Sequence, residues 1–346
     1  MSEDSLLSQL LAGKVAALAR AVSIVENGRA GFEQLLASIH PRLGRARRIG
    51  ITGPPGAGKS TLTERLVSAY RARDLRVAVV AVDPTSPFSG GALLGDRIRM
   101  EQIALDPGVY IRSMATRGSL GGLATSTREV CDLLDAAGFD RILVETVGVG
   151  QSELDVARMA DSTVLVLVPE SGDGIQALKS GVMEVADCFL INKADRPGAE
   201  KVRREVELAL DLRLGKAHRN VPAHHGALRR GAPVAAEADA ANTLAWRAPV
   251  LTGVASKGEG IDALIEALDH HWEWMGASGE LERRRRLRFA QRTREVIDRA
   301  TQRWVWQESH AERAINARLD DVTAGQLSPY ELAAEIVAAL KEGAGV

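Results

Sequence analysis

The chain has few of the features that mark secreted, membrane-spanning or nucleic-acid-binding proteins. It has two cysteines, Cys131 and Cys188, each in an apolar stretch, which favours buried reduced thiols in a cytoplasmic protein over a disulfide or a metal pair. Its formal net charge is −1, which argues against general attraction to nucleic acids or membrane surfaces. It has no run of about eighteen apolar residues, and its first segment is acidic and amphipathic, so we expect no transmembrane helix and no signal peptide.

What the chain does have is a complete phosphate-binding loop, GPPGAGKST, at residues 53–61. A strand-like segment precedes it and a helix-like segment follows it, as this motif requires. Gly53 and Gly58 allow the backbone to curl, so that successive N–H groups point toward a polyphosphate, and the dipole of the following helix adds to the attraction. Lys59 supplies a positive charge to the outer phosphates, and the Ser60 hydroxyl can bind Mg²⁺. The expected phosphate-binding residues are Gly53, Pro54, Pro55, Gly56, Ala57, Gly58, Lys59, Ser60 and Thr61.

Around this loop, apolar runs alternate with amphipathic helical segments over residues 46–275, which indicates an α/β fold. The runs are continuous in Val, Ile and Leu and do not alternate with polar residues, so helices are expected on both faces of the sheet. We therefore predict a P-loop NTPase with a mostly parallel central sheet and with helical extensions at both ends. The predicted strands cover residues 47–52, 76–83, 109–114, 141–148, 162–169, 188–194 and 249–255.

The predicted domain organisation has three parts. Residues 1–45 form an N-terminal helical extension, in which apolar residues at helical spacing predict two helices separated at Asn27-Gly28. Residues 46–278 form the P-loop domain, within which residues 215–247 lack periodicity and are expected to make a surface excursion. Residues 279–346 form a C-terminal helical arm.

The arm is predicted to contain a long charged helix and a second helix that begins at Ser328-Pro329. It lies outside the strand pattern and is too small to be a catalytic domain. Two interpretations stay open: self-association of two chains through the arm, which we prefer, and packing of the arm on its own sheet. The run Arg283–Arg286 fits a solvated helix face better than a nucleic-acid site, because no aromatic-rich segment accompanies it.

The base that binds is predicted from the NKxD box Asn192-Lys193-Ala194-Asp195, which ends a predicted strand. The Asp195 carboxylate can accept hydrogen bonds from the N1–H and the exocyclic amine of guanine, whereas adenine has no N1–H donor. We expect Asn192 to bond the purine edge and the stem of Lys193 to lie along the base. A later strand end, containing Gly253, Val254 and Ala255, is expected to place backbone N–H groups against the guanine carbonyl.

Acidic residues at two further strand ends are candidates for managing Mg²⁺. Asp83 and Glu145 each end a predicted strand, and ligands of α/β folds bind at this edge of the sheet. We expect one of them to hold Mg²⁺ beside Ser60, directly or through water. A Gly-, Ser- and Pro-rich segment follows Asp83 and is expected to rearrange with the γ-phosphate, with Asp96 as a further metal-side or switch candidate. The expected metal residues are therefore Ser60, Asp83, Asp96 and Glu145.

Hydrolysis is expected to be slow in the isolated protein. Ras-type GTPases carry a glutamine directly after the glycine of the third motif, but here Gly148 is followed by Val149, and Gln151 lies further on. Asp83 is the better-placed candidate to position the attacking water. We therefore expect a rate that depends on a partner.

A further Gly-rich segment at residues 169–181 carries Lys179. This lysine can reach a phosphate or a neighbouring subunit, or it can simply lie on a helix surface, and both interpretations stay open. The expected catalytic residues are Lys59, Asp83, Glu145 and Lys179.

The predicted strand at residues 76–83 begins shortly after the P-loop helix, so it must be parallel and reached by a short right-handed crossover. This connection is typical of the dimerising class of GTPases that includes signal-recognition GTPases and metallochaperones.

One family in this class has similar motifs. The segments GITGPPGAGKST, VAVDPTSPFSGGALLGDRIRM, ILVETVGVGQSE and INKAD, in this order, closely resemble the MeaB/ArgK-type GTPases, the methylmalonyl-CoA mutase-associated proteins. The resemblance implies a homodimeric GTPase that chaperones the adenosylcobalamin-dependent methylmalonyl-CoA mutase. Such a protein gates cofactor delivery and protects the mutase from inactivation, with GTP hydrolysis as the timer. The chain departs from the family at Val254-Ala255, where Ser-Ala is common, so a serine side-chain role is lost while a backbone contact from Ala255 is kept.

Three other functions are considered. A nickel-type metallochaperone GTPase for another metalloenzyme needs a Cys/His site, and the chain has no CxxC and no His-rich tail. Its adjacent pairs His224-His225 and His270-His271 are poorly spaced for one metal. An ATP-dependent kinase linked to amino-acid transport conflicts with the guanine box. An interaction module with an inactive nucleotide site conflicts with intact Lys59, Ser60 and Glu145.

Overall fold

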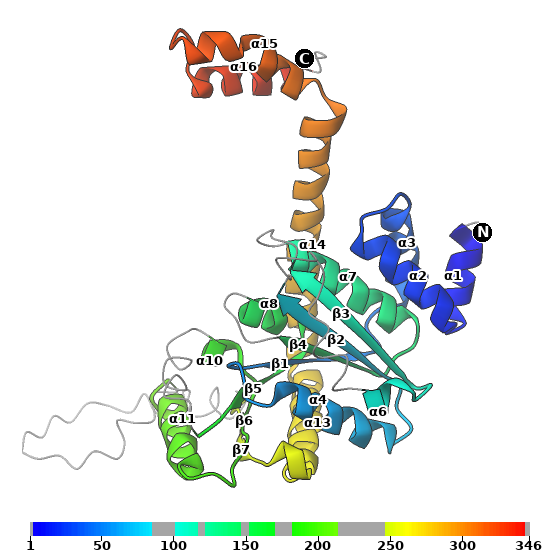
Figure 1. Cartoon of the computed structure of the whole chain (residues 1–346), viewed down its shortest axis with the longest axis vertical. Helices are drawn as coiled ribbons and strands as arrows, with labels where there is room; N and C mark the ends of the chain where they lie inside the picture. Colours follow the sequence, from blue (N-terminus) through cyan, green and yellow to red (C-terminus); the bar gives the residue numbers. More distant parts are fainter. Residues whose placement is uncertain are drawn as a thin grey trace, which may run out of the picture. The chain divides into compact units, whose positions relative to one another are not determined.

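The computed structural model describes residues 3–84, 101–116, 122–146, 152–169, 182–213 and 246–342 (Figure 1). The chain divides into two compact units, residues 1–284 and residues 285–346. Each unit has its own apolar core, so we describe each one separately.

The first unit is built on a seven-stranded sheet with the order β3-β2-β4-β1-β5-β6-β7. All neighbouring strands pair in parallel, which confirms the predicted fold class and the parallel crossover after the P-loop helix. The strands are β1 (Arg47–Thr52), β2 (Val77–Pro84), β3 (Val109–Thr116), β4 (Arg141–Thr146), β5 (Ser162–Leu167), β6 (Cys188–Ile191) and β7 (Val250–Thr252).

The continuous apolar strands are explained by helices on both faces of this sheet. In β5, Val164 and Val166 belong to the apolar cluster on one face, whereas Leu165 belongs to the cluster on the other. The first face is covered by α4 (Lys59–Arg71) and α13 (Ile261–Ser278). On the opposite face, α7 (Gly122–Ala136) packs over β2 and β4, and α11 (Ala199–Arg213) packs over β6 and β7. Successive side chains of a strand point to opposite faces, so a strand covered on both sides must be apolar throughout.

The N-terminal extension contains three helices, not the two that were predicted. These are α1 (Glu3–Leu11), α2 (Val15–Glu26) and α3 (Phe32–Ile39), which lie beside α7 in Figure 1. The predicted break at Asn27-Gly28 is confirmed, and the additional break lies at Gly13, whose φ of 72° is a left-handed conformation that glycine adopts without steric cost.

The remaining elements of the first unit are short or connect the strands. They are η1 (His40–Arg42), α6 (Glu101–Ala104), α8 (Ser152–Met159), α10 (Val182–Val185) and η3 (Ala255–Lys257). Both cysteines are buried free thiols, and burial raises the pKa of Cys131 to about 11 and that of Cys188 to about 12. No single helix among the described residues is long and apolar enough to cross a membrane. The helices α1 and α2 reach that length and apolar composition only together, and the chain bends sharply between them.

The second unit is entirely helical over its described residues. Helix α14 (Glu280–Arg303) enters it, followed by η4 (Trp304–Glu308), α15 (Ala311–Thr323) and α16 (Pro329–Lys341). The predicted helix start at Ser328-Pro329 is confirmed. There the Ser328 hydroxyl accepts a hydrogen bond from the Glu331 N–H at 3.2 Å, and the Glu331 carboxylate accepts one from the Ser328 N–H at 2.9 Å. The predicted domain boundaries at residues 45 and 278 stay predictions.

Candidate nucleotide-binding site

The phosphate-binding loop lies between β1 and α4, at the carboxyl edge of the sheet. Two of its glycines are required by close packing as well as by backbone conformation. A Cβ on Gly53 would lie 2.1 Å from the Val166 carbonyl oxygen, and one on Gly58 would lie 2.5 Å from Asn192 Nδ2. Both glycines have positive φ values, 138° and 88°, which also disfavour larger residues. The loop is thus held close to β5 and β6, with its backbone exposed on the other side.

Lys59 is buried and folds back over this loop. Its Nζ donates hydrogen bonds to the carbonyl oxygens of Gly53, at 2.8 Å, and Pro54, at 3.0 Å. An ammonium group has three donors and carries a full charge, so anionic phosphate oxygens would compete well with these neutral carbonyls. Lys59 is therefore positioned to transfer its hydrogen bonds to a polyphosphate.

Glu145, at the end of β4, is buried beside the first turn of α4. Ser60 Oγ donates to Glu145 Oε1 at 2.6 Å, and Thr63 Oγ1 donates to Glu145 Oε2 at 2.8 Å. Donation by the Ser60 hydroxyl leaves the lone pairs of its oxygen available to a cation. A hydroxyl and a carboxylate are hard oxygen ligands of the kind that Mg²⁺ prefers, so this donor set fits the predicted metal.

Thr63 was not predicted from the sequence. It lies three positions after Ser60 on α4, and residues at this spacing share a helix face, which is the signal that was available. Its hydroxyl also lies 3.0 Å from the Lys59 carbonyl oxygen. A hydroxyl has one proton, so the shorter, charge-assisted contact to Glu145 is the better hydrogen bond. Thr63 therefore orients Glu145.

Asn192 connects the phosphate-binding loop to the loop after β7. Its Nδ2 donates to the Ala57 carbonyl oxygen at 2.8 Å, and its Oδ1 accepts from the Ala255 N–H at 3.0 Å. Asn192 is buried and aligns these two loops, and the expectation that it also bonds the purine edge stays a prediction. The sequence spacing identifies the NKxD box but does not show in which direction the Asn192 side chain points.

The other two polar residues of this box are more exposed. Lys193 has a φ of 56° and extends across the loop, where its Nζ donates to the Gly56 carbonyl oxygen at 2.8 Å. The Asp195 carboxylate pairs with Lys257 at 3.5 Å, and the two side chains are 43% and 56% exposed. Lys257 was not predicted. An exposed pair of this kind contributes little stability, so the Asp195 carboxylate stays accessible to a hydrogen-bonding ligand.

The three amides predicted to face the guanine carbonyl are all used within the protein. The N–H groups of Gly253, Val254 and Ala255 donate at 3.0 Å to Ile191 O, Glu259 O and Asn192 Oδ1, respectively. The Ala255 amide is occupied by Asn192 in this structure, and its predicted contact with the guanine carbonyl stays a prediction. The Lys257 N–H donates to the Val254 carbonyl oxygen at 2.9 Å. Among the described residues, none accepts a hydrogen bond from the Ser256 N–H.

The carbonyl groups of the same loop are held by Arg65 of α4. Arg65 Nε donates to the Ala255 carbonyl oxygen at 3.2 Å, and a terminal guanidinium nitrogen donates to the Ser256 carbonyl oxygen at 2.9 Å. Arg65 was not predicted either, and no local sequence signal indicates it, because its partners lie 190 and 191 positions away.

Several predicted site residues cannot be placed. Asp96, Gly148 and Lys179 lie outside the described residues, as does Gln151. The backbone of Asp83 lies at the end of β2, and its neighbour Val82 pairs with Thr146 at the end of β4. The roles of these residues therefore stay predictions.

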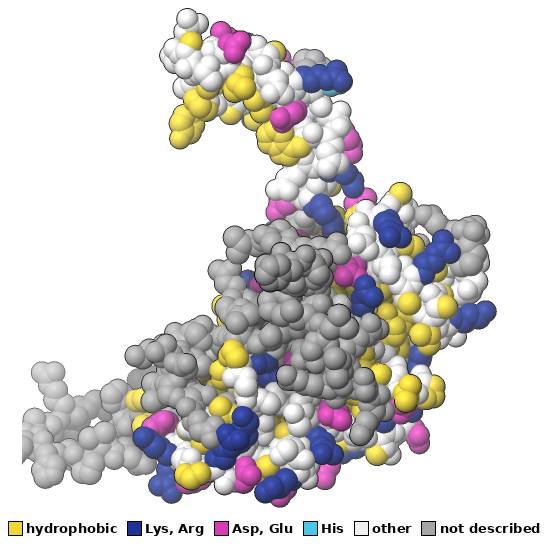
Figure 2. Space-filling model, viewed as in Figure 1, with side chains coloured by type: hydrophobic (Ala, Val, Ile, Leu, Met, Phe, Trp, Pro, Cys, Tyr) yellow, Lys and Arg dark blue, Asp and Glu magenta, His cyan; other side chains and the backbone are white. Residues whose placement is uncertain are grey.

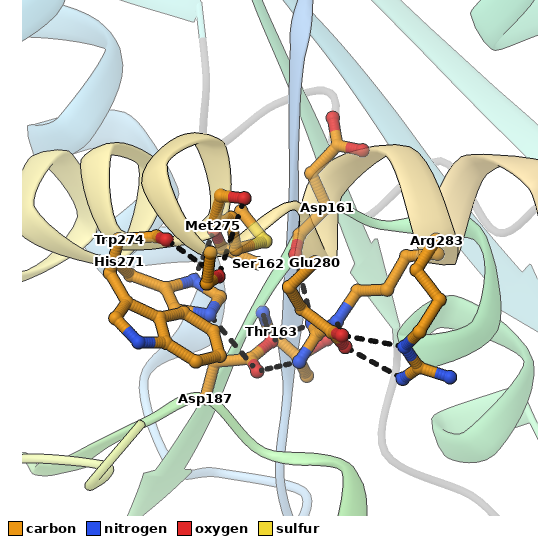
Figure 3. A network of polar contacts seen from close by, with 11 residues as sticks. Asp161, Ser162, Thr163, Asp187, His271, Trp274, Met275, Glu280 and Arg283 are labelled. Carbon is orange, nitrogen blue, oxygen red and sulfur yellow. Dashed lines mark hydrogen bonds and ion pairs between the residues drawn. The ribbon is translucent and has the colours of Figure 1, made fainter. Parts of the chain in front are cut away.

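A second polar cluster has the order of a hydrolytic triad but not its accessibility (Figure 3). Ser162 Oγ lies 2.8 Å from His271 Nδ1, and His271 Nε2 lies 3.4 Å from Asp187 Oδ1. However, Ser162 and His271 are only 4% and 1% exposed, so no substrate can reach them. The cluster lies where β5 and β6 begin, at the opposite edge of the sheet from the phosphate-binding loop.

Arg284 completes this cluster from the first turn of α14. It donates to both carboxylate oxygens of Asp187, at 2.9 and 3.2 Å, and to Glu280 Oε1 at 2.9 Å. Burial is the largest influence on His271 and lowers its pKa, so the ring is neutral at pH 7. The cluster thus fastens the start of α14 to the sheet. In the described part of the chain, no group of three or more His, Cys, Asp or Glu side chains is arranged to hold a metal ion.

One family model, two related proteins and one solved structure each match most of this chain. The family model of the methylmalonyl-CoA mutase-associated GTPase MeaB matches residues 18–310. A Pyrococcus abyssi protein whose name contains the word GTPase is 46% identical over 294 residues, covering 85% of this chain and 83% of the relative. A mouse protein named methylmalonic aciduria type A homolog, mitochondrial, is 36% identical over 297 residues, covering 82% of this chain and 66% of the relative. The crystal structure of a LAO/AO transport system kinase, 30% identical, covers 99% of each chain with a TM-score of 0.64.

Proposed function

The chain belongs to the family of methylmalonyl-CoA mutase-associated GTPases, and we propose that it is a GTP-hydrolysing chaperone of an adenosylcobalamin-dependent methylmalonyl-CoA mutase. The observation that carries this proposal is the family match over residues 18–310, together with Lys59, Ser60 and Glu145 at the carboxyl edge of the sheet. The names of the family and of the mouse relative support this client. In this role the protein gates cofactor loading and protects the mutase, and GTP hydrolysis times the release.

Phosphate binding is assigned to the loop at residues 53–61. Lys59 exchanges its carbonyl contacts for the outer phosphates, and the N-terminus of α4 adds its positive dipole. Ser60 and Glu145 would hold Mg²⁺, directly or through water. Magnesium, when bound, neutralises charge on the transferred phosphoryl group. Thr63 keeps the carboxylate turned toward Ser60.

Base recognition is assigned to Asp195 and to the loop after β7. The Asp195 carboxylate accepts from guanine N1–H and the exocyclic amine, and the Ser256 N–H replaces Ala255 as the donor to the carbonyl oxygen at position 6. Adenine has a hydrogen-bond acceptor at N1 and a donor at position 6, the reverse of guanine. The stem of Lys193 covers the base from the side of the phosphate loop.

Slow intrinsic turnover follows from Val149, which stands where Ras-type GTPases carry the water-orienting glutamine. We assign water positioning to Asp83, keep Asp96 as a metal-side candidate, and keep Gly148 among the nucleotide-binding residues. Lys179 reaches either a phosphate or a neighbouring subunit. A high rate in the isolated protein would contradict this assignment.

Homodimerisation through residues 279–346 is part of the proposal. Figure 2 shows yellow hydrophobic side chains on the surface of the second unit. Trp304, Trp306 and Tyr330 are 44%, 54% and 88% exposed, and side chains of this type are enriched in the cores of protein interfaces. Sedimentation of the full chain and of the Trp304→Ser, Trp306→Ser double variant measures this: the double variant should become monomeric.

The client is tested by co-purification with a methylmalonyl-CoA mutase and by GTP turnover with and without it. We expect a stable complex and faster turnover in the complex. The Lys59→Met variant serves as the matched control, because it should lose turnover in both conditions. Absence of both binding and stimulation would remove the client while leaving the GTPase in place.

A further inference from the structure

The peptide unit between Ala255 and Ser256 is held on only one side. Its carbonyl oxygen accepts hydrogen bonds from Arg65 Nε at 3.2 Å and from the Gly258 N–H at 3.1 Å, while its N–H belongs to Ser256. On either side of it, the Ala255 N–H is occupied by Asn192, and the Lys257 N–H by the Val254 carbonyl oxygen. Of the amides in this turn, only that of Ser256 has no acceptor among the residues that the structure describes, so it is the donor left for a ligand.

The geometry of a trans peptide links Arg65 to that donor. The unit is planar, and its C=O and N–H bonds point in opposite directions. A guanidinium that holds the carbonyl oxygen, together with the Gly258 N–H, therefore fixes where the N–H points. It also polarises the amide, because hydrogen bonds in a chain strengthen one another, and more so when one partner is charged.

We propose that Arg65 is a positioning residue for guanine selectivity, acting through the Ser256 N–H on the oxygen at position 6 of the base. This inference rests on the proposed guanine pocket and goes beyond it, because Arg65 reaches the base through the backbone. The second contact, from Arg65 to the Ser256 carbonyl oxygen at 2.9 Å, fixes the rotation of the turn and makes the arrangement bidentate. Arg65 lies on the same helix as Lys59 and Ser60, so phosphate binding and base recognition share one rigid element.

The affinities for GTP, ITP and ATP, compared with one another, distinguish the Asp195 contact to the base from the Ser256 contact. ITP keeps the oxygen at position 6 and the N1–H but lacks the exocyclic amine, so the GTP to ITP affinity ratio measures the amine contact of Asp195. ATP carries an amine at position 6, so the GTP to ATP ratio includes the contact that Arg65 controls. A general loss of loop structure would lower both ratios.

The experiment measures the affinities of the three nucleotides by competition with a fluorescent GDP, on the full-length chain. The variants are Arg65→Met, which keeps the stem and removes every donor, and Arg65→Lys, which keeps the charge but not the bidentate geometry. Arg73→Met is the matched control, because Arg73 follows the same helix and pairs with Asp269, away from the guanine loop. The side chain of Arg65 is largely exposed, so we expect both Arg65 variants to fold.

In Arg65→Met we expect the GTP to ATP ratio to fall about tenfold, with the GTP to ITP ratio unchanged. Arg65→Lys should lie between this variant and the wild type, and Arg73→Met should match the wild type. An unchanged GTP to ATP ratio, an equal fall in both ratios, or the same fall in Arg73→Met would overturn the role of Arg65. A wild-type protein without preference for GTP over ATP would instead refute the guanine pocket itself.

Discussion

The two edges of the parallel sheet use similar polar residues for opposite purposes. At the carboxyl edge, Lys59, Ser60 and Asp195 have hydrogen-bonding capacity that a ligand can take over. At the amino edge, Asp187 accepts from Arg284 and from the Thr163 N–H, and the histidine beside it is sealed from solvent. Polar groups that satisfy one another in a closed cluster stabilise a fold, whereas polar groups with remaining capacity at an open edge bind ligands.

The largest expected effect lies at the amino edge. Asp187→Ala removes the bidentate partner of Arg284, which keeps its contact to Glu280, and it removes the acceptor of the Thr163 N–H. We expect the free energy of unfolding to fall by about 3–5 kcal/mol, as when one partner of a buried ion pair is removed. Chemical denaturation measures this. Asp211→Ala, which breaks an exposed pair with Arg247, should cost less than about 1 kcal/mol. Equal costs in the two variants would remove the contrast between buried and exposed pairs.

The next effect lies at the carboxyl edge and changes activity more than stability. Lys59→Met removes the charge that is positioned for the outer phosphates, so GTP turnover should fall by about a hundredfold or more. Thermal unfolding without nucleotide should change little, because the carbonyl groups of the loop can bond to water. If Lys59→Met lowered the melting temperature strongly while its folded fraction kept normal turnover, Lys59 would serve the fold and not the reaction.

A smaller effect is expected at Thr63, a buried residue that orients Glu145 at the ligand-binding edge. Thr63→Val keeps the side-chain shape but removes the hydrogen bond that Thr63 donates to Oε2 of the buried Glu145. We expect turnover to fall about tenfold and the Mg²⁺ concentration for half-maximal rate to rise. Thr63→Ser should restore both values, since it returns the hydroxyl. Normal Mg²⁺ dependence in Thr63→Val would exclude an orienting role for this residue.

The smallest effect is a pH dependence of stability from His271. Its folded pKa lies below the usual value of about 6.5, so the unfolded chain binds more protons as the pH falls below that value. Stability from the neutral ring is fully present above pH 6.5 and is lost below it, by at most about 1.4 kcal/mol for each pH unit. Melting temperatures measured from pH 8 to pH 5 test this. The control variant is His270→Gln, which changes the exposed neighbouring histidine. His271→Gln should flatten the curve, and a curve as steep as that of the wild type would assign the pH dependence to other groups.

The local parts of the fold and the site were predictable from the sequence. The phosphate-binding loop, the NKxD box and the positions of the strands depend on residues that are close in the chain, such as the glycines at positions 53 and 58 and the apolar run of β5. The helix start at Ser328 is local in the same way. The break at Gly13 was missed because an isolated glycine within a helical pattern does not by itself require a helix end.

The sequence by itself therefore determined the fold class, the nucleotide loop and the guanine box, because glycine conformations, helix caps and apolar runs act over a few residues. Only the tertiary structure decided the direction of each polar group. It placed Asn192 between the phosphate-binding loop and the loop after β7, brought Thr63 to Glu145, and placed Arg65 against a loop 190 residues away. Hydrogen bonds are directional and act over about 3 Å, so their partners follow from how helices and strands pack.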